Sequence, residues 1–134
     1  MIFVDTSAFY ALEVEGDVNH AAARRFLEEI KGGKYGVMVT TDYVLDEVLT
    51  LLRLRHGVDA ALRFLEKVRR SRSIKVVWVD ESVFEQALRY FKLDEGRRWS
   101  FTDCTSFAVM EMLGIRQAFD FDEGFELAGF VRLP

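Results

Sequence analysis

The sequence predicts an α/β fold in which a parallel sheet is covered by helices on both faces. Short apolar runs such as residues 2–4 and 74–79 have the length and composition of buried strands. They alternate with longer segments whose apolar residues recur at helical spacing, as in residues 20–30. Strands that alternate with amphipathic helices are typical of parallel sheets. The length of 134 residues favours a single domain, residues 1–134.

Five strands are expected from apolar runs that end at polar residues. The first run ends at Asp5, and the fourth run ends among the acids Asp120 and Asp122. The third run is continuous enough to predict a strand that is buried on both faces. The expected strands are residues 2–4, 35–40, 74–79, 117–121 and 130–133.

Seven helices are expected between these strands, each from a capping residue, an apolar stripe or a terminating glycine. Thr41 or Asp42 is placed to cap the third helix, and Asp80 is placed to cap the fifth. Gly114 is placed to close the sixth helix. The expected helices are residues 8–12, a helix from Asp17 or Asn19 to the glycines at 32–33, 42–56, one with Asp59 in its first turn and an apolar stripe to Val68, 82–91, one from Thr102 or Asp103 to Leu113, and 123–128. The apolar faces of these helices place Phe84, Phe91, Phe107 and Phe125 in the core.

The charge balance argues against recognition of nucleic acid through a bulk positive field. The chain has 18 Lys and Arg residues against 22 Asp and Glu residues, a formal net charge of −4. A polyanionic substrate would therefore need local arginine clusters or a bound cation. The single cysteine, Cys104, excludes an internal disulfide. Because no apolar run approaches the ~20 residues of a membrane span and no signal peptide is evident, we expect no membrane association and a cytoplasmic location.

Acidic residues from four separate segments are predicted near one edge of the sheet. Asp5 follows the first strand, Asp120 and Asp122 follow the fourth, and Asp103 opens a helix. Glu47 borders the apolar face of its helix. Carboxylates that converge without basic partners should either protonate or bind a cation. Oxygen-only ligands suit Mg²⁺ or Mn²⁺, and such an ion supports hydrolysis of a phosphodiester.

Each acid also has a purely structural interpretation. Asp5 is placed to cap a helix, and Asp103 is placed to favour the helix dipole as a first-turn acid. Glu47 would be satisfied by an Arg or Lys that the sequence does not identify. Asp120 and Asp122 would serve to end a strand and cap a helix. Taken together, the acids favour a site more strongly than any one of them does alone.

Four stretches of the sequence resemble the PIN-domain family, and within it the VapC-type toxins of type II toxin–antitoxin systems. They are residues 2–9, 41–47, 100–107 and 118–125, in family order and at family spacing. The resemblance implies a three-layer α/β/α sandwich with a five-stranded parallel sheet. It also implies a metal-dependent ribonuclease acting on single-stranded RNA, a homodimer, and an antitoxin partner that blocks the site. The acidic quartet that it implies is Asp5, Glu47, Asp103 and Asp122.

The chain departs from the family pattern at two positions. Asp120 stands where many relatives have Thr or Ser, which leaves open whether Asp120 or Asp122 reaches the metal. Gly124 stands where a His or another polar residue is common. On this interpretation Asp5 and Asp103 are direct ligands of Mg²⁺ or Mn²⁺. The other acids, Glu47, Asp122 and Asp120, would act through water or a second ion, and the products would carry a 5′-phosphate and a 3′-hydroxyl.

Two groups of residues are candidates for contact with the substrate. Hydroxyl groups near the acids would donate to a phosphate or a water, although capping explains each of them; they are Thr6, Ser7, Thr102 and Ser106. The run Arg97, Arg98 and Trp99 combines charge for phosphates with a ring for base stacking. The alternative is a surface loop with Trp99 packed against the core. Several leucines, among them Leu45 and Leu65, would line a groove for a partner helix unless they are core.

Three other functions are weighed against the ribonuclease. A haloacid-dehalogenase-like phosphatase needs an acid two residues after its nucleophilic aspartate, where this chain has Ser7. A phospho-accepting receiver domain would use Asp80, but this position is better explained as a helix cap. A catalytically inactive PIN-like module that only binds RNA or protein stays open, although the intact quartet argues against it.

Overall fold

The computed structural model describes residues 1–93 and 96–134 and has five parallel strands at its centre. The strand order is β3-β2-β1-β4-β5, so the N-terminal strand is the middle one. Phe3 of β1 accordingly pairs with Val39 on one side and Ala118 on the other. The strands are β1 (Ile2–Val4), β2 (Met38–Thr41), β3 (Ile74–Val77), β4 (Gln117–Phe119) and β5 (Val131–Leu133).

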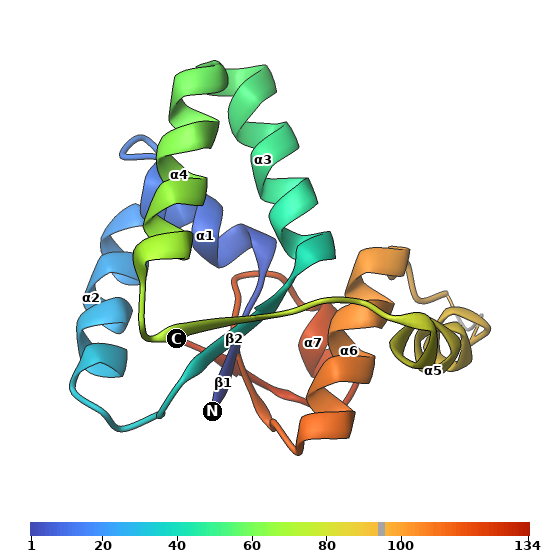
Figure 1. The fold of residues 1–134 in the computed structure, drawn as a ribbon. Helices are drawn as coiled ribbons and strands as arrows, with labels where there is room; N and C mark the ends of the chain where they lie inside the picture. Colours follow the sequence, from blue (N-terminus) through green and yellow to red (C-terminus); the bar gives the residue numbers. More distant parts are fainter. Residues whose placement is uncertain (94–95) are drawn as a thin grey trace.

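Helices cover both faces of this sheet, as predicted, and give a three-layer α/β/α arrangement (Figure 1). Helices α1 and α2 lie on one side and α6 and α7 on the other, while α3 and α4 form a hairpin that projects beyond the sheet. The helices are α1 (Thr6–Glu13), α2 (His20–Lys31), α3 (Asp42–His56), α4 (Val58–Arg70), α5 (Glu81–Phe91), α6 (Phe101–Leu113) and α7 (Gly124–Leu127).

The helix boundaries follow the local signals of the sequence. Thr41 caps α3 because its hydroxyl oxygen accepts a hydrogen bond from the backbone N–H of Val44 at 3.1 Å. Asp80 caps α5 in the same way through the N–H of Val83 at 2.9 Å. Gly114 ends α6 with φ of 69°, a left-handed conformation that favours glycine. The predicted capping role of Asp80 is therefore confirmed, and it leaves no support for a receiver-type acceptor at this position.

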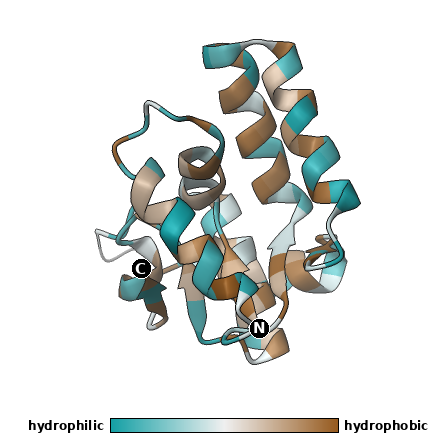
Figure 2. Cartoon of the chain, turned by 90° about the vertical axis from the view of Figure 1, so that its left-hand side faces the viewer, coloured by the Kyte–Doolittle hydropathy of each residue, from teal (hydrophilic) through white to brown (hydrophobic). Residues whose placement is uncertain are grey.

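The core lies between the sheet and the inner faces of the helices. Helix α6 is the most deeply placed, and residues 104–110 are all buried. Phe107 packs edge-on against Phe125 at 5.0 Å between ring centroids, and Phe125 in turn contacts Phe3 of the central strand. Figure 2 shows the resulting pattern, in which hydrophobic and hydrophilic residues alternate around most helices. The predicted burial of Phe107 and Phe125 is confirmed.

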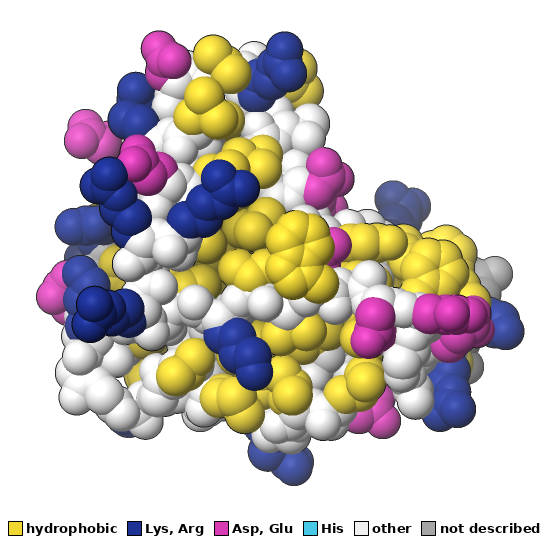
Figure 3. All heavy atoms as spheres, viewed as in Figure 1, with side chains coloured by type: hydrophobic (Ala, Val, Ile, Leu, Met, Phe, Trp, Pro, Cys, Tyr) yellow, Lys and Arg dark blue, Asp and Glu magenta, His cyan; other side chains and the backbone are white. Residues whose placement is uncertain are grey.

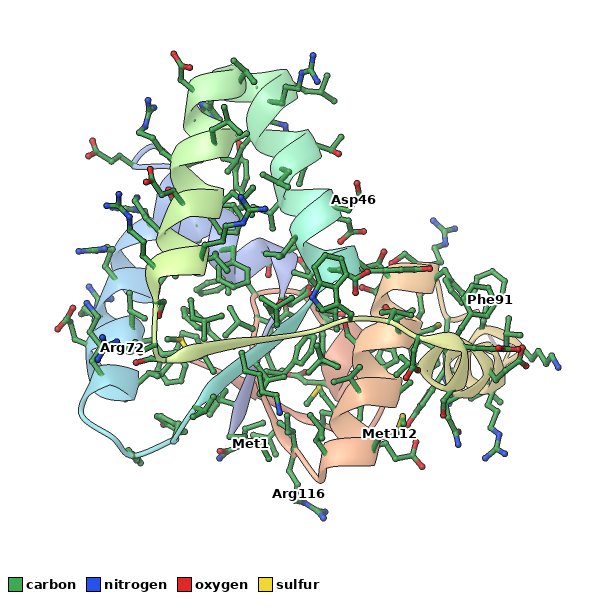
Figure 4. The ribbon with its side chains drawn as sticks, in the orientation of Figure 1. Met1, Asp46, Arg72, Phe91, Met112 and Arg116 are labelled. Carbon is green, nitrogen blue, oxygen red and sulfur yellow. The ribbon has the colours of Figure 1, made fainter. Side chains whose placement is uncertain are left out.

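Two predictions about burial are wrong. Strand β3 lies at the edge of the sheet rather than inside it, and Trp78 just beyond it is 72% exposed. Phe84 and Phe91 are also exposed, and their rings pack on the ring of Phe101 at the surface (Figure 4 labels Phe91). An apolar run does not reveal whether a strand is central or at an edge, because an edge strand beside an apolar groove has the same composition as a central one.

A groove of about 550 Å³ accounts for much of the apolar character of β3. It lies between this strand and the α3–α4 hairpin, and Figure 3 shows hydrophobic side chains gathered in this region of the surface. Its apolar lining is Leu45, Leu49, Leu65, Val68, Ile74, Val76 and Trp78. Of the leucines predicted to line a groove, Leu45 and Leu65 do so. Within the described residues no helix is long and apolar enough to cross a membrane.

Candidate metal centre

A cleft of about 760 Å³ opens beyond the carboxyl ends of β1 and β4. Its walls come from α1, from α3, from the start of α6 and from the segment after β4. Asp46 extends from α3 at the outer part of this wall (Figure 4). The acidic residues that line the cleft are Asp5, Asp17, Asp46, Glu47, Asp103 and Asp122. All four members of the predicted quartet therefore reach one cleft.

Asp5 is buried at the floor of the cleft without a hydrogen-bond partner for one of its oxygens. Its backbone is tied to the sheet, because its N–H donates to the carbonyl of Phe119 at 3.1 Å. The side chain is 4% exposed, yet Oδ1 contacts no donor among the described residues. It also makes no capping bond to α1, although it occupies the cap position. The structure therefore does not support the capping interpretation of Asp5.

Asp120 is equally buried and is held by Ser7. The hydroxyl of Ser7 donates a short hydrogen bond to Oδ1 of Asp120 and accepts one from the N–H of Phe121 at 2.9 Å. The other oxygen, Oδ2, has no hydrogen-bond partner among the described residues, and the side chain is 1% exposed. Asp120 is thus a buried carboxylate whose hydrogen-bonding capacity is only half satisfied among these residues.

Asp122 completes a group of three carboxylates. One oxygen each from Asp5, Asp120 and Asp122 lies within 4.8 Å of the others, and Asp122 itself is exposed. Asp120 and Asp122, the two acids that follow β4, therefore both approach Asp5. The predicted use of Asp122 is compatible with this geometry, and Asp120 adds a carboxylate to it.

Burial and mutual repulsion disfavour the ionised forms of these acids. Burial raises the pKa of Asp5 well above its ordinary 3.8, and the charges of Asp120 and Asp103 raise it further. Burial likewise raises the pKa of Asp120 to about 6, against the lowering effect of the Ser7 hydrogen bond. The protein therefore holds negative charge here at a cost in stability that a bound cation would remove.

Glu47 is oriented by a threonine on another helix. The hydroxyl of Thr6 donates to Oε1 of Glu47 at 2.7 Å, and a side-chain hydrogen bond from Thr102 also lowers the pKa of Glu47. Burial is the larger effect, so the pKa is raised overall. The described residues give Glu47 no Arg or Lys in an ion pair, in contrast to the structural alternative considered for it.

Asp103 takes part in the cap of α6 and also lines the cleft. Its Oδ2 accepts from the N–H of Ser100 at 3.0 Å while its own N–H donates to the Ser100 hydroxyl, which makes a capping box at the start of α6. Its other oxygen is not used by the cap, and Asp103 still lines the cleft. Burial raises its pKa, with a further contribution from the charge of Asp122. It lies outside the close group of three, so its role as a direct ligand stays a prediction.

The three grouped acids fit a hard divalent cation. Two of their oxygens are buried and have no hydrogen-bond partner in the part of the chain that the structure describes, which is costly for a carboxylate unless a donor or a cation is present. All the donor atoms are oxygens, and no His or Cys belongs to the group. This donor set is the kind that Mg²⁺ and Mn²⁺ prefer over Zn²⁺.

The predicted substrate-binding hydroxyls divide into three cases. Thr6 and Ser7 line the cleft, but their hydrogens are donated to Glu47 and Asp120. Thr102 is half-buried next to Glu47. Ser106 is fully buried and donates to the carbonyl of Thr102 at 3.1 Å, so the expectation that it contacts a substrate is wrong.

The segment with Arg97, Arg98 and Trp99 does not line the cleft. The indole N–H of Trp99 donates to the carbonyl of Gly124 at 3.1 Å, and its ring packs edge-on against Phe107 at 5.1 Å. Arg97 lies over the same indole ring at 5.3 Å. Trp99 is therefore anchored against the core, which favours the alternative of a surface loop packed on the core, and base stacking by Trp99 stays an untested prediction. The charged loop predicted at 94–98 lies in part outside the described residues.

Among the cleft residues that were not predicted as site residues are Tyr10 and Arg55. Arg55 follows Glu47 by eight residues on α3, a little over two helical turns, which brings it back toward the same side. Nothing in the sequence alone indicates that Tyr10 lies beside it.

The fold and the cleft define a class of protein, an α/β domain that gathers carboxylates from separate elements in one cleft. A family model for the PIN domain matches residues 2–131, and the chain belongs to the PIN-domain family.

Similar proteins place it among the VapC-type members of that family. It is 41% identical over 133 residues to the 23S rRNA-specific endonuclease VapC20 of Mycobacterium tuberculosis, covering 99% of this chain and 98% of the relative. It is 30% identical over 125 residues to the VapC ribonuclease of Archaeoglobus fulgidus, covering 92% of this chain and 78% of the relative.

Solved structures agree with this grouping. The crystal structure of Mycobacterium tuberculosis VapC20, described as a sarcin-ricin loop cleaving toxin, matches with a TM-score of 0.87 at 40% identity and covers 98% of this chain and 97% of that one. FitAcB from Neisseria gonorrhoeae matches with a TM-score of 0.70 at 16% identity, covering 100% of this chain and 97% of that one, which supports the fold alone.

Proposed function

We propose that this protein is a metal-dependent endoribonuclease that hydrolyses phosphodiester bonds in single-stranded RNA. The observation that carries the proposal is that Asp5 and Asp120, two buried carboxylates grouped with Asp122, each have one oxygen without a hydrogen-bond partner among the described residues. The names of two VapC relatives, an rRNA endonuclease and a ribonuclease, support the choice of substrate. Because of the first of these, 23S rRNA is the substrate to test first.

The residues of the cleft suggest a role for each acid in catalysis. Asp5, Asp120 and Asp122 would hold Mg²⁺ or Mn²⁺, with Asp103 as a further direct ligand. The bound ion supplies charge stabilisation for the phosphate and the leaving oxygen and eases ionisation of water. Glu47, oriented by Thr6, would accept a proton from the attacking water. In-line attack on phosphorus would leave a 5′-phosphate and a 3′-hydroxyl.

The test is cleavage of 23S rRNA by the purified chain with Mg²⁺ or Mn²⁺. EDTA and the variant Asp5→Asn should each abolish cleavage. Glu85→Gln is the matched control, because it also converts a carboxylate to an amide but lies exposed on α5. Cleavage that persists both in EDTA and in Asp5→Asn would refute the metal mechanism. RNA binding without any cleavage by the wild type would favour the inactive binding module instead.

We also infer that the protein works in the cytoplasm as the toxin of a toxin–antitoxin pair and forms a homodimer. The description of VapC20 as a toxin supports the first inference. The apolar groove beside β3 offers a surface for a protein partner. Light scattering should give twice the mass of the chain, and a short chain encoded beside it should bind and stop cleavage. A monomer would contradict the dimer, and cleavage unaffected by that short chain would contradict the antitoxin.

A further inference from the structure

One basic side chain stands on the wall of an otherwise acidic cleft. Among the described residues that line it, Arg55 is the only Lys or Arg, and six lining residues are acids. A cation at the metal centre neutralises charge only locally, whereas a bound RNA strand brings phosphates along its whole length. The remaining lining acids, such as Asp17 and Asp46, would repel these phosphates unless a basic group compensates.

The guanidinium of Arg55 is held in place by an aromatic ring. Its central carbon lies 5.4 Å from the centre of the Tyr10 ring, a cation–π arrangement between α3 and α1. The hydroxyl of Tyr10 is in turn 3.1 Å from Nε2 of His56. The ring is thus fixed at its edge by a hydrogen bond and supports Arg55 with its face.

The hydrogen-bond donors of Arg55 are not used within the described chain. It makes no ion pair and no side-chain hydrogen bond there, although acids line the same cleft. An arginine plane supported by a ring keeps its N–H groups free for a planar, bidentate contact with a phosphate. The Tyr10 ring therefore orients the guanidinium of Arg55, and its N–H groups have no acceptor within the described chain.

Stabilisation of the helix end explains Arg55 only in part. Arg53, Arg55 and His56 all lie in the last turn of α3, where cations interact favourably with the helix dipole. Arg53 shares this role and does not line the cleft. The dipole accounts for positive charge at this end, but not for the contact of Arg55 with Tyr10 or for its place in the lining of the cleft. Arg53 is for that reason the natural control.

We propose that Arg55 binds a backbone phosphate of the RNA away from the scissile bond, and that Tyr10 is the positioning residue that holds it. This inference rests on the proposed ribonuclease function and moves the basic contact from Arg97 and Arg98 to the end of α3. The phosphate contact is made before and during cleavage alike. It therefore contributes to substrate binding rather than to the chemical step.

The experiment compares variants in steady-state cleavage of a single-stranded RNA oligonucleotide with Mn²⁺ at several KCl concentrations. Arg55→Ala should raise KM about tenfold, leave kcat within about twofold, and reduce the slope of log KM against log salt by about 0.7. Arg55→Lys should keep the slope but still raise KM, because a lysine lacks the planar fork. Arg53→Ala should change neither quantity.

The role of Tyr10 has its own pair of variants. Tyr10→Leu removes the ring and should raise KM nearly as much as Arg55→Ala, whereas Tyr10→Phe keeps the ring, loses only the hydrogen bond to His56, and should raise KM clearly less. Equal effects of Tyr10→Phe and Tyr10→Leu would overturn the positioning role. An unchanged KM and salt slope in Arg55→Ala, or the same change in Arg53→Ala, would overturn the phosphate site.

Failure of the proposed function is recognised separately in the wild type. If the wild type cleaves no RNA, the oligonucleotide stays intact, and fluorescence anisotropy in Mg²⁺ measures affinity directly. Arg55→Ala should then weaken binding about tenfold with the same loss of salt slope. Equal affinities of wild type and Arg55→Ala would reject the phosphate site whether or not the protein is an enzyme.

Discussion

Replacing Asp120 by asparagine should stabilise the metal-free protein at neutral and alkaline pH. The side chain is buried, its Oδ2 has no hydrogen-bond partner within residues 1–93 and 96–134, and burial raises its pKa from 3.8 to about 6. An amide has nearly the same shape and can still accept the hydrogen bond from Ser7. The substitution therefore removes a buried charge with little change in packing.

The size of the effect follows from the pKa of Asp120. Since its folded-state pKa is raised, its contribution to stability is complete below about pH 3.8 and is lost as the pH rises through about 6. A shift from 3.8 to about 6 corresponds to about 3 kcal/mol at pH 8. For a domain of 134 residues this is on the order of 10 °C in Tm.

Thermal unfolding in EDTA from pH 4 to pH 8 measures the effect. The Tm of Asp120→Asn should nearly match that of wild type at pH 4 and exceed it by on the order of 10 °C at pH 8. Added Mg²⁺ should raise the Tm of wild type more than that of the variant, because the variant has lost one ligand. The exposed control Glu85→Gln should follow wild type throughout. A variant that is less stable than wild type at pH 8, or a difference independent of pH, would refute the reasoning.

Three further substitutions separate the roles of the surrounding side chains. Ser7→Ala should raise the pKa of Asp120 further and cost about 1–3 kcal/mol in urea unfolding, and an NMR titration that shows a lower pKa would contradict this. Thr6→Val should lower kcat about tenfold with little change in KM, because Glu47 loses its 2.7 Å hydrogen bond. Thr6→Ser should restore kcat. A rise in KM with kcat unchanged would argue against this role of Thr6. Trp99→Phe should cost about 1 kcal/mol of stability and leave KM for RNA unchanged, since the indole is anchored in the fold; a large rise in KM would return Trp99 to the substrate site.

The sequence predicted those parts of the fold that depend on local signals. Helix ends at Thr41, Asp80 and Gly114 were identifiable because caps act within three or four residues. The edge position of β3 was not, since its apolar run faces a surface groove and has the composition of a buried strand. The exposed ring of Phe91 illustrates the same limit, because helical spacing does not say what the apolar face packs against.

The site was predicted in outline and not in detail. Parallel strands bring the acids after β1 and β4 to one edge, so Asp5 and Asp122 could be placed from order alone. The hydrogen bond from Ser7 to Asp120 joins residues 113 positions apart, and no local pattern indicates it. Arg55 could not be distinguished from an ordinary exposed arginine for a related reason, because its contact with Tyr10 joins two different helices.

The central claim is that Asp5, Asp120 and Asp122 together bind a divalent cation. Anomalous scattering from crystals soaked in Mn²⁺ tests it most directly, because it locates the ion independently of any activity. We expect a peak within bonding distance of oxygens of Asp5 and Asp120, beside Asp122 and on the side of the cleft that Asp103 lines. A well-ordered cleft with no peak there, or a peak only at other carboxylates, would contradict the account.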